Sequence, residues 1–153
     1  MKALENKIPP PVLMFIMAVA MWGAAKIQAA VTIESHLRIG LMVALGVIAL
    51  AFSIGGIIAF RAAKTTLNPV QIDRASRLVT GGIYRFSRNP MYVGLTALLA
   101  GWAVFLAVPL TAIGPVAFAL FMYRFQILPE ERVMAEKFGR EYLEYKQRVR
   151  RWV

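Results

Sequence analysis

Cysteine is absent from this sequence of 153 residues, and His36 is its single histidine. Without cysteine the chain can form no disulfide, no thiolate metal site, no cysteine nucleophile and no lipidated cysteine. One histidine leaves no room for a metal site built from several imidazoles. Acidic residues are also scarce, with eight Asp and Glu against 18 Lys and Arg, and charged residues make up only 17% of the chain. The classes of enzyme that depend on thiols or histidine-rich metal sites are therefore excluded.

Apolar residues, in contrast, are abundant. They account for 59% of the chain, and the mean hydropathy is +0.60. Soluble domains contain about 45–50% apolar residues, so the composition predicts a membrane protein, and the length suits one domain over residues 1–153. The net charge of +10 is confined between apolar stretches. Nucleic acid is therefore not an expected partner, and the expected surroundings are the lipid bilayer.

Four apolar segments are candidates for membrane-spanning helices, at residues 11–31, 39–60, 91–108 and 111–128. A helix needs about 20 residues to cross the hydrocarbon core, so the last two are short. Proline cannot continue a helix interior, and Pro109 therefore predicts a tight helical hairpin between them. The expected fold class is an all-α integral membrane protein with four transmembrane helices, the last two a short hairpin, followed by cytoplasmic C-terminal helices.

Glycines lie within the second segment, and two interpretations of them are open. Gly46, Gly55 and Gly56 can permit close helix packing, but glycine is also simply common in membrane helices. We favour the second interpretation.

Basic residues indicate the orientation. The first ten residues, the loop 61–88 and the tail after Leu128 together carry 15 of the 18 Lys and Arg. Positive charge gathers on the cytoplasmic side of membrane proteins, which predicts four passes with both termini cytoplasmic, in an inner or plasma membrane. Most of these cations need no further role, because they fix topology and attract anionic lipid at about 1 kcal/mol each.

The stretch 78–94 contains more than topology requires. Gly81 and Gly82 allow positive φ, Asn89 suits a helix N-cap and Pro90 suits the first helical turn. A loop rich in tyrosine and arginine is thus joined to a helix N-terminus, which favours a carboxylate or phosphate. The alternative is an anchor of aromatic and arginine side chains at the interface.

The stretch 124–145 is the second unusual one. Arg124 lies within the fourth apolar segment, where an ionisable residue is a functional candidate unless it reaches out to the interface. Gly139 is expected to end a helix, and Tyr142 and Tyr145 then share a helix face. The alternative for this tail is an amphipathic helix that lies on the membrane.

A hairpin returns the chain to the side from which it came, so both stretches are expected at one cytoplasmic end. The sequence has no Ser/His/Asp set for hydrolysis and no GxxxxGK[ST] motif. Tyrosines, arginines and carboxylates at the water–lipid boundary suit a water-soluble cofactor that reacts with an oily partner.

These two motifs resemble the isoprenylcysteine carboxyl methyltransferase family and the related phospholipid N-methyltransferases. The resemblance is carried by residues 78–94, which include the run Ser-Arg-Asn-Pro-Met-Tyr, and by Glu130-Glu131 with Phe138-Gly139 after them; it extends over about 78–149. It implies S-adenosylmethionine as the methyl donor and a hydrophobic or amphiphilic acceptor, such as a lipid, an isoprenoid-type compound or a small molecule. A prenylated protein is not the favoured acceptor, because the chain is short.

The resemblance also implies which residues form the site. Arg124 and Glu130 are the expected catalytic residues. The expected cofactor-binding residues are Gly82, Tyr84, Arg88, Asn89, Pro90, Tyr92, Gly94 and Glu131, and no metal is expected. The family usually has histidine where this chain has Asn89, and asparagine cannot act as a general base.

The acceptor decides the chemistry. A carboxylate acceptor would be oriented by Arg124, whereas an amine acceptor would lose its proton to Glu130. We expect either acceptor to enter sideways from the bilayer, between the second span and the hairpin. A noncatalytic scaffold or lipid-binding protein that keeps the fold is the first alternative, and a methyltransferase for small thiols or phenols in the aqueous phase is the second. The acceptor, the methylated atom and the oligomeric state stay open.

Overall fold

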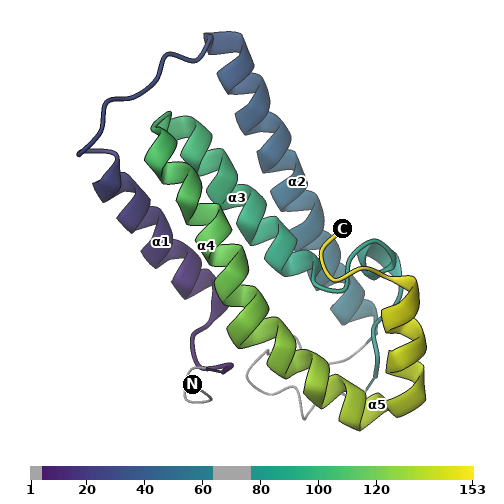
Figure 1. Cartoon of the computed structure of the whole chain (residues 1–153). Helices are drawn as coiled ribbons and strands as arrows, with labels where there is room; N and C mark the ends of the chain where they lie inside the picture. Colours follow the sequence, from purple (N-terminus) through teal and green to yellow (C-terminus); the bar gives the residue numbers. More distant parts are fainter. Residues whose placement is uncertain (1–4, 64–76) are drawn as a thin grey trace.

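A computed structural model describes residues 5–63 and 77–153, and this part of the chain is helical without strands (Figure 1). The α-helices are α1 (Pro10–Ala24), α2 (Ser35–Ala62), α3 (Pro90–Leu106), α4 (Ile113–Met122) and α5 (Leu128–Arg148). Two short 3₁₀ helices, η3 (Gly82–Arg85) and η4 (Pro109–Ala112), and a π-helix, η5 (Tyr123–Ile127), complete the elements. The all-α prediction is confirmed for these residues.

Two of the helical stretches are long and apolar enough to cross a membrane. They are α2 and the continuous stretch Pro109–Arg148, whereas α1 and α3 are apolar but shorter. At 1.5 Å per residue, α1 reaches only about 22 Å and α3 about 25 Å, less than the hydrocarbon core of about 30 Å. Of the loop expected at 61–88, residues 64–76 lie outside the described residues, and Lys64 and Arg74 with them.

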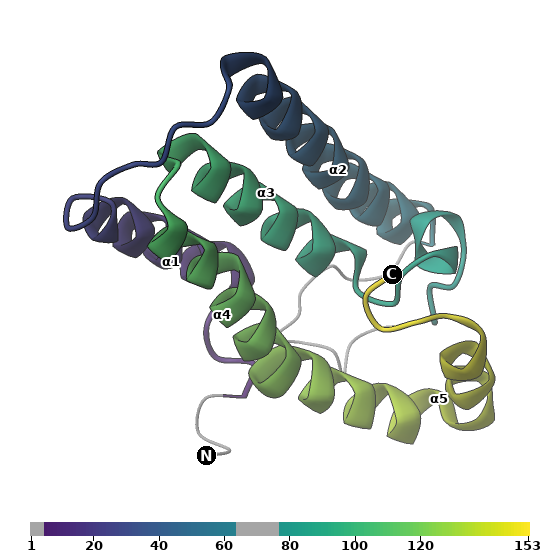
Figure 2. The same cartoon turned by 45° about the horizontal axis from the view of Figure 1, so that its top comes forward.

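Helix α3 occupies the middle of the bundle. It lies between α2 on one side and α1 with α4 on the other (Figures 1 and 2). On the side of α1 and α4, Leu99, Phe118 and Met122 form a core that is almost wholly buried. The indole of Trp102 joins α3 to α1 by donating a 3.0 Å hydrogen bond to the carbonyl of Ala18.

Glycines bring α2 and α3 close together. A Cβ atom on Gly94 would meet the Ser53 hydroxyl and lie 2.9 Å from the carbonyl oxygen of Ala49, and one on Gly56 would lie 2.7 Å from Met91. Gly55 faces Ile83 in the same way, at 3.2 Å. The interpretation that glycines in α2 are mere background is thus wrong for Gly55 and Gly56. It holds for Gly46, where an added Cβ atom would meet no atom of another helix within 4 Å in the described residues.

The hairpin expected near Pro109 is present. Helix α3 ends at Ala107 in a left-handed conformation, with φ of 54°, and η4 then turns the chain into α4. The hydroxyl of Thr111 is buried and donates a 2.6 Å hydrogen bond to the carbonyl of Val108, which satisfies a polar group within the turn. The chain therefore folds back so that α4 runs antiparallel to α3 (Figure 2).

The first predicted span is too long. The helix ends at Ala24 rather than Val31, and a turn over residues 25–28 leads into a stretch without regular secondary structure. The reason is that these residues pair with the hairpin: the amide of Val31 donates to the carbonyl of Ala107 at 2.7 Å, and the side chain of Gln28 accepts from the amide of Leu110 at 3.3 Å. These tertiary hydrogen bonds replace those of a continued helix.

The second span begins earlier than predicted. The helix starts at Ser35 rather than at residue 39, because the carboxylate of Glu34 caps it by accepting from the amides of His36 and Leu37 at 3.0 and 2.9 Å. Arg38 then reaches across and donates to the carbonyl of Phe105, which joins α2 to the end of α3.

A π-helix links α4 to α5 where a proline interrupts the hydrogen bonding. Pro129 has no amide hydrogen, so it cannot donate to the carbonyl four residues earlier, that of Phe125. The helix widens into η5, Tyr123–Ile127, just before it. Further on, Gly139 adopts φ 50° and ψ −123° and kinks α5, so the last segment turns back toward α3, and Gly139 ends one helical segment as predicted (Figure 1).

Candidate functional site

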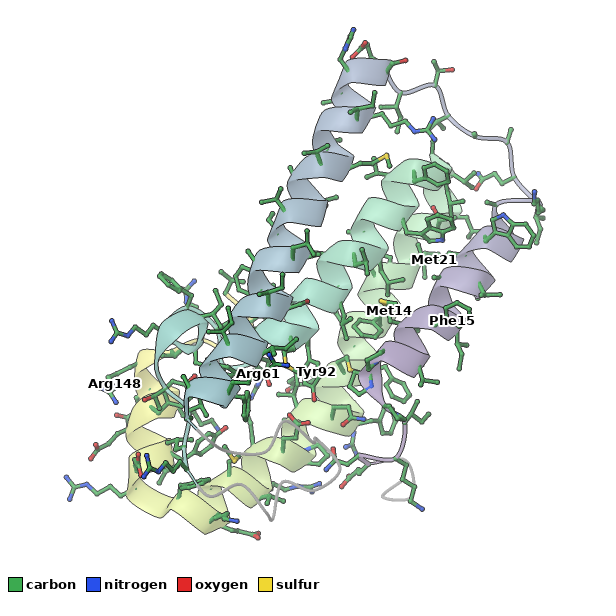
Figure 3. The ribbon with its side chains drawn as sticks, turned by 180° about the vertical axis from the view of Figure 1, so that it is seen from behind. Met14, Phe15, Met21, Arg61, Tyr92 and Arg148 are labelled. Atoms are coloured by element: carbon green, nitrogen blue, oxygen red, sulfur yellow. The ribbon has the colours of Figure 1, made fainter. Side chains whose placement is uncertain are left out.

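Tyr92 and Glu130 are brought together by the hairpin. Tyr92 lies in the first turn of α3 and Glu130 in the first turn of α5, and the tyrosine hydroxyl donates a 2.5 Å hydrogen bond to Oε1 of the glutamate. Tyr92 is buried, and Figure 3 shows it at the end of α3 that faces α5. A phenol–carboxylate pair therefore lies at one end of the apolar bundle.

Glu131, the next residue, has different partners. Its carboxylate accepts from Arg88 at 2.6 Å and, with both oxygens, from Arg151 at 2.8 and 2.9 Å, and it lies 3.3 Å from the ammonium of Lys146. The side chains of Arg88 and Glu131 are only 7% and 9% exposed. Bidentate charge-assisted bonds of this kind are strong and geometrically specific. Glu131 thus joins the loop before α3 to the end of the chain.

The C-terminal segment is hydrogen-bonded to the residues at the start of α3. The amide of Arg88 donates to the carbonyl of Arg150 at 3.0 Å, and the Arg88 side chain donates to the carbonyl of Val149 at 2.6 Å. Asn89 stands at the N-cap position as predicted, but its side chain does not cap the helix. It donates instead to the carbonyl of Arg151 at 2.9 Å. The expectation of a side-chain cap at Asn89 is therefore wrong, because the returning tail offers it a carbonyl.

Three tyrosines of the two motifs form a second cluster. Gly82 has φ of 60°, as its sequence position predicts, and starts η3, which carries Tyr84 into the interior. Tyr142 and Tyr145 share a face of α5, both are buried, and the hydroxyl of Tyr145 donates to the carbonyl of Tyr84 at 2.7 Å. The tail is thus packed by its tyrosines against η3, whereas an amphipathic helix on the membrane would leave them in lipid.

The two adjacent carboxylates have opposite electrostatic surroundings. Burial raises the pKa of Glu130 to about 7, although the hydrogen bond from Tyr92 acts in the other direction. Burial also opposes ionisation of Glu131, but the hydrogen bonds and charges of Arg151 and Arg88 outweigh it and lower the pKa of Glu131 to about 2. Carboxyl groups whose pKa values are driven apart in this way are suited to different roles.

Two of the predicted site residues lie apart from this arrangement. Arg124 is 44% exposed and pairs with Glu5 at 3.6 Å, so the structure does not bring it to Tyr92 or Arg88. Gly94 faces α2, where it permits close packing. The other predicted residues, Gly82, Tyr84, Arg88, Asn89, Pro90, Tyr92, Glu130 and Glu131, lie in or beside the two clusters just described.

Arg151 and Trp152 were missed from the sequence. Arg151 lies among basic C-terminal residues that resemble topology-fixing cations. It nevertheless binds Glu131, and its guanidinium carbon lies 4.9 Å from the ring centroid of Tyr123. Trp152 packs against the core that includes Tyr92. A surplus of cations over what topology needs was the available signal, but it does not tell which cation is used.

Comparison with known proteins assigns the family. A sequence model described as phospholipid methyltransferase matches residues 36–141. An uncharacterized protein of Haemophilus influenzae is 43% identical over 63 residues, which is 41% of this chain and 100% of that protein.

The named relatives are larger. Protein-S-isoprenylcysteine O-methyltransferase B of Arabidopsis thaliana is 39% identical over 88 residues, which is 56% of this chain and 43% of the relative. The human protein-S-isoprenylcysteine O-methyltransferase is 41% identical over 75 residues, 47% of this chain and 25% of the relative. The chain therefore spans less than half the length of these curated relatives. On the extent of the family match, together with the all-helical apolar fold, the chain belongs to the phospholipid methyltransferase family.

Proposed function

We propose that the chain transfers a methyl group from S-adenosylmethionine to a hydrophobic or amphiphilic acceptor at the cytoplasmic face of a membrane. The observation that carries this proposal is the Tyr92–Glu130 pair, a buried phenol bonded to a carboxyl at the end of an apolar helical bundle. The family supports it, as do relatives that are named O-methyltransferases of isoprenylcysteine.

The residues around Glu130 fit a cationic cofactor. S-adenosylmethionine presents a sulfonium, an ammonium, a carboxylate and ribose hydroxyls. Glu130 forms no ion pair within the described residues, so its carboxylate is available to accept a hydrogen bond from a ribose hydroxyl of the cofactor. The ring of a tyrosine such as Tyr92 attracts positive charge. When bound, the cofactor supplies an electrophilic methyl group.

Arg88 and Glu131 have a different role in this proposal. The predicted task of Arg88, to hold the cofactor's carboxylate, competes with its bonds to Glu131, Lys146 and Val149. We therefore assign Arg88 and Glu131 as positioning residues that fix the loop before α3 against the tail. The Nε of Arg88 is buried and lacks a partner within the described residues, so this donor is available to a ligand.

Glu130 is the residue that we assign to proton transfer. For an acceptor that loses a proton on methylation, a base with a pKa near the operating pH is the most effective, and the pKa of Glu130 is raised to about 7. Burial of the pair also excludes water, and alignment of the reactants supplies much of the rate. Arg124 is assigned to orient a carboxylate acceptor only after it leaves Glu5, to which it is bound at 3.6 Å.

The topology is part of the same proposal. We place the chain in an inner or plasma membrane as a single domain of four passes, with the termini and the Tyr92–Glu130 pair on the cytoplasmic side. The short helices α1 and α3 are accommodated by tilt or by local thinning of the bilayer. Apolar side chains of α2 such as Val47 and Leu50 are 59% and 61% exposed, and they face the lipid in this arrangement.

Methyl transfer from radiolabelled S-adenosylmethionine into lipids extracted from bacterial and eukaryotic membranes tests the proposal and identifies the acceptor. The purified chain should label a product that partitions into organic solvent, and Glu130→Gln should reduce the rate at least 100-fold, the usual contribution of a general base. Glu136→Gln, which changes an exposed glutamate of the same helix, should leave the rate unchanged. Binding of lipid without any transfer of label would favour the lipid-binding scaffold instead.

A further inference from the structure

The N-terminal segment is fastened to the π-helix by several contacts. The amide of Asn6 donates to the carbonyl of Phe125 at 3.0 Å, the carbonyl that Pro129 cannot serve. The side-chain amide of Gln126 donates to the carbonyl of Ile8 at 2.8 Å. Glu5 pairs with Arg132 at 2.5 Å. Residues 5–8 therefore lie along η5 and the start of α5.

Two oxygens at this contact lack hydrogen-bond donors. Oε1 of Gln126 and Oδ1 of Asn6 are both buried, and neither has a partner in the described part of the chain. Gln126 is only 1% exposed, and its amide nitrogen is fixed by Ile8, so its oxygen cannot be exchanged for the nitrogen by a flip of the side chain. A buried polar atom without a partner costs about 1–3 kcal/mol, which makes two such atoms in one contact a sign of an absent donor.

The position of this pair relates it to the candidate site. Gln126 precedes Glu130 by four residues, which places both on the same side of the helical stretch that runs from η5 into α5. π-helical turns are rare and are often found at functional sites. A ligand group held by Gln126 would therefore lie about one helical turn from the Tyr92–Glu130 pair.

We propose that Asn6 and Gln126 form a subsite for a hydrogen-bond-donating group, a hydroxyl or an amine, on the methyl acceptor. Both free atoms are amide oxygens, which accept hydrogen bonds and cannot donate them. The subsite therefore selects head groups that carry O–H or N–H and discriminates against those that offer only acceptors. This inference rests on the proposed function for the identity of the ligand, but its binding chemistry is testable alone.

Asn6 offers a variant that removes one oxygen without removing the local backbone structure. Its φ of 56° is a conformation that glycine adopts freely, and its bond to Phe125 uses the backbone amide. Asn6→Gly should therefore keep the backbone bond to Phe125 and remove the side-chain amide that carries Oδ1. Lys7→Gly, at the exposed next residue, controls for the added flexibility.

The binding test uses the full chain in phosphatidylcholine nanodiscs, because this lipid has no O–H or N–H donor in its head group. The probes are dodecanol and dodecylamine, each paired with a compound that lacks the donor: dodecyl methyl ether and dodecyltrimethylammonium. Ligands that bind the folded state raise the unfolding temperature, which tryptophan fluorescence reports. Each donor probe should bind the wild type about tenfold more tightly than its donorless partner, and Asn6→Gly but not Lys7→Gly should reduce that preference.

The outcomes separate this inference from the proposed function. Equal binding of the paired probes, or a preference that Asn6→Gly leaves intact, would overturn the subsite. A higher unfolding temperature of Asn6→Gly with no change in probe binding would assign the oxygens to an ordered water, which also overturns it. Donor preference in a chain that neither binds S-adenosylmethionine nor transfers methyl groups would refute the proposed function and leave the subsite standing.

Discussion

Glu130 and Glu131 are neighbours on α5 but belong to two different networks. Glu130 accepts a hydrogen bond from the hydroxyl of Tyr92, whereas Glu131 forms ion pairs with three basic residues. Burial leaves Glu130 only about half ionised at pH 7, whereas the arginines keep Glu131 ionised. Of the two glutamates of the motif, we thus assign Glu130 to the reaction and Glu131 to holding the fold.

The pH profile should report Glu130. Because burial raises its pKa to about 7, the proton-accepting form grows as the pH rises through 7, and kcat/KM for an acceptor that loses a proton should rise with it. The hydrogen bond from Tyr92 lowers this pKa, so Tyr92→Phe should move the rise to higher pH. Rates measured from pH 5.5 to 9 provide the test, and a profile that Tyr92→Phe lowers uniformly without displacement would argue against Glu130 as the base.

The ion pair between Arg88 and Glu131 should contribute mainly to the stability of the fold. Removal of one partner from a buried ion pair costs about 3–5 kcal/mol, and since Arg151 and Lys146 still neutralise Glu131 in Arg88→Met, a loss of about 3 kcal/mol in the free energy of unfolding is expected.

Reversible unfolding in mixed micelles measures this loss. Arg140→Met breaks an ion pair with Glu144 whose arginine side chain is 92% exposed, and it should change stability by less than about 1 kcal/mol. Equal effects of the two substitutions would show that the Arg88–Glu131 pair contributes no more than a surface contact.

Gly94 should matter for helix packing. A methyl group in Gly94→Ala would lie 2.9 Å from the backbone carbonyl of Ala49 and would also meet Ser53, so α2 and α3 must separate, at a cost of about 1–3 kcal/mol. Gly46→Ala is the matched control, because nothing lies within 4 Å of that site. Thermal unfolding of both variants should show a lower midpoint for Gly94→Ala alone. A cofactor affinity that falls while the unfolding midpoint stays unchanged would instead return Gly94 to the cofactor site.

The proposed topology can be mapped with single cysteines, because the natural chain contains none. Leu110→Cys in the hairpin turn should react with a membrane-impermeant maleimide added outside intact cells. Arg140→Cys on α5 should react only after the cells are permeabilised. Both positions are exposed in the fold, so burial does not limit the labelling. Labelling of both from the same side would contradict the four-pass arrangement.

Features that depend on local chemistry were predictable from the sequence. Pro109 predicted the hairpin, Gly82 predicted the positive φ, and Gly139 predicted the break in α5. Each of these features depends on the backbone preference of one residue. Apolar runs also located the helices to within a few residues, except where Val31 and Gln28 exchange helical hydrogen bonds for bonds to the hairpin.

Features that depend on distant partners were not predictable. Arg151 is 20 residues from Glu131 and Glu5 is 119 residues from Arg124, and no local pattern tells which of many cations meets a given carboxylate. The side chain of Asn89 likewise bonds to the tail, through the carbonyl of residue 151, and does not cap its own helix. The sequence thus predicted which stretches meet, but not how their charges are paired.

Calorimetric titration of the detergent-purified chain with S-adenosylmethionine tests the central claim most directly. The wild type and Glu136→Gln should bind with micromolar affinity, and Glu130→Gln should bind at least tenfold more weakly because it loses the carboxylate that accepts a hydrogen bond from the cofactor's ribose. Absence of binding heat from folded wild-type protein, or an equal affinity of Glu130→Gln, would contradict the account.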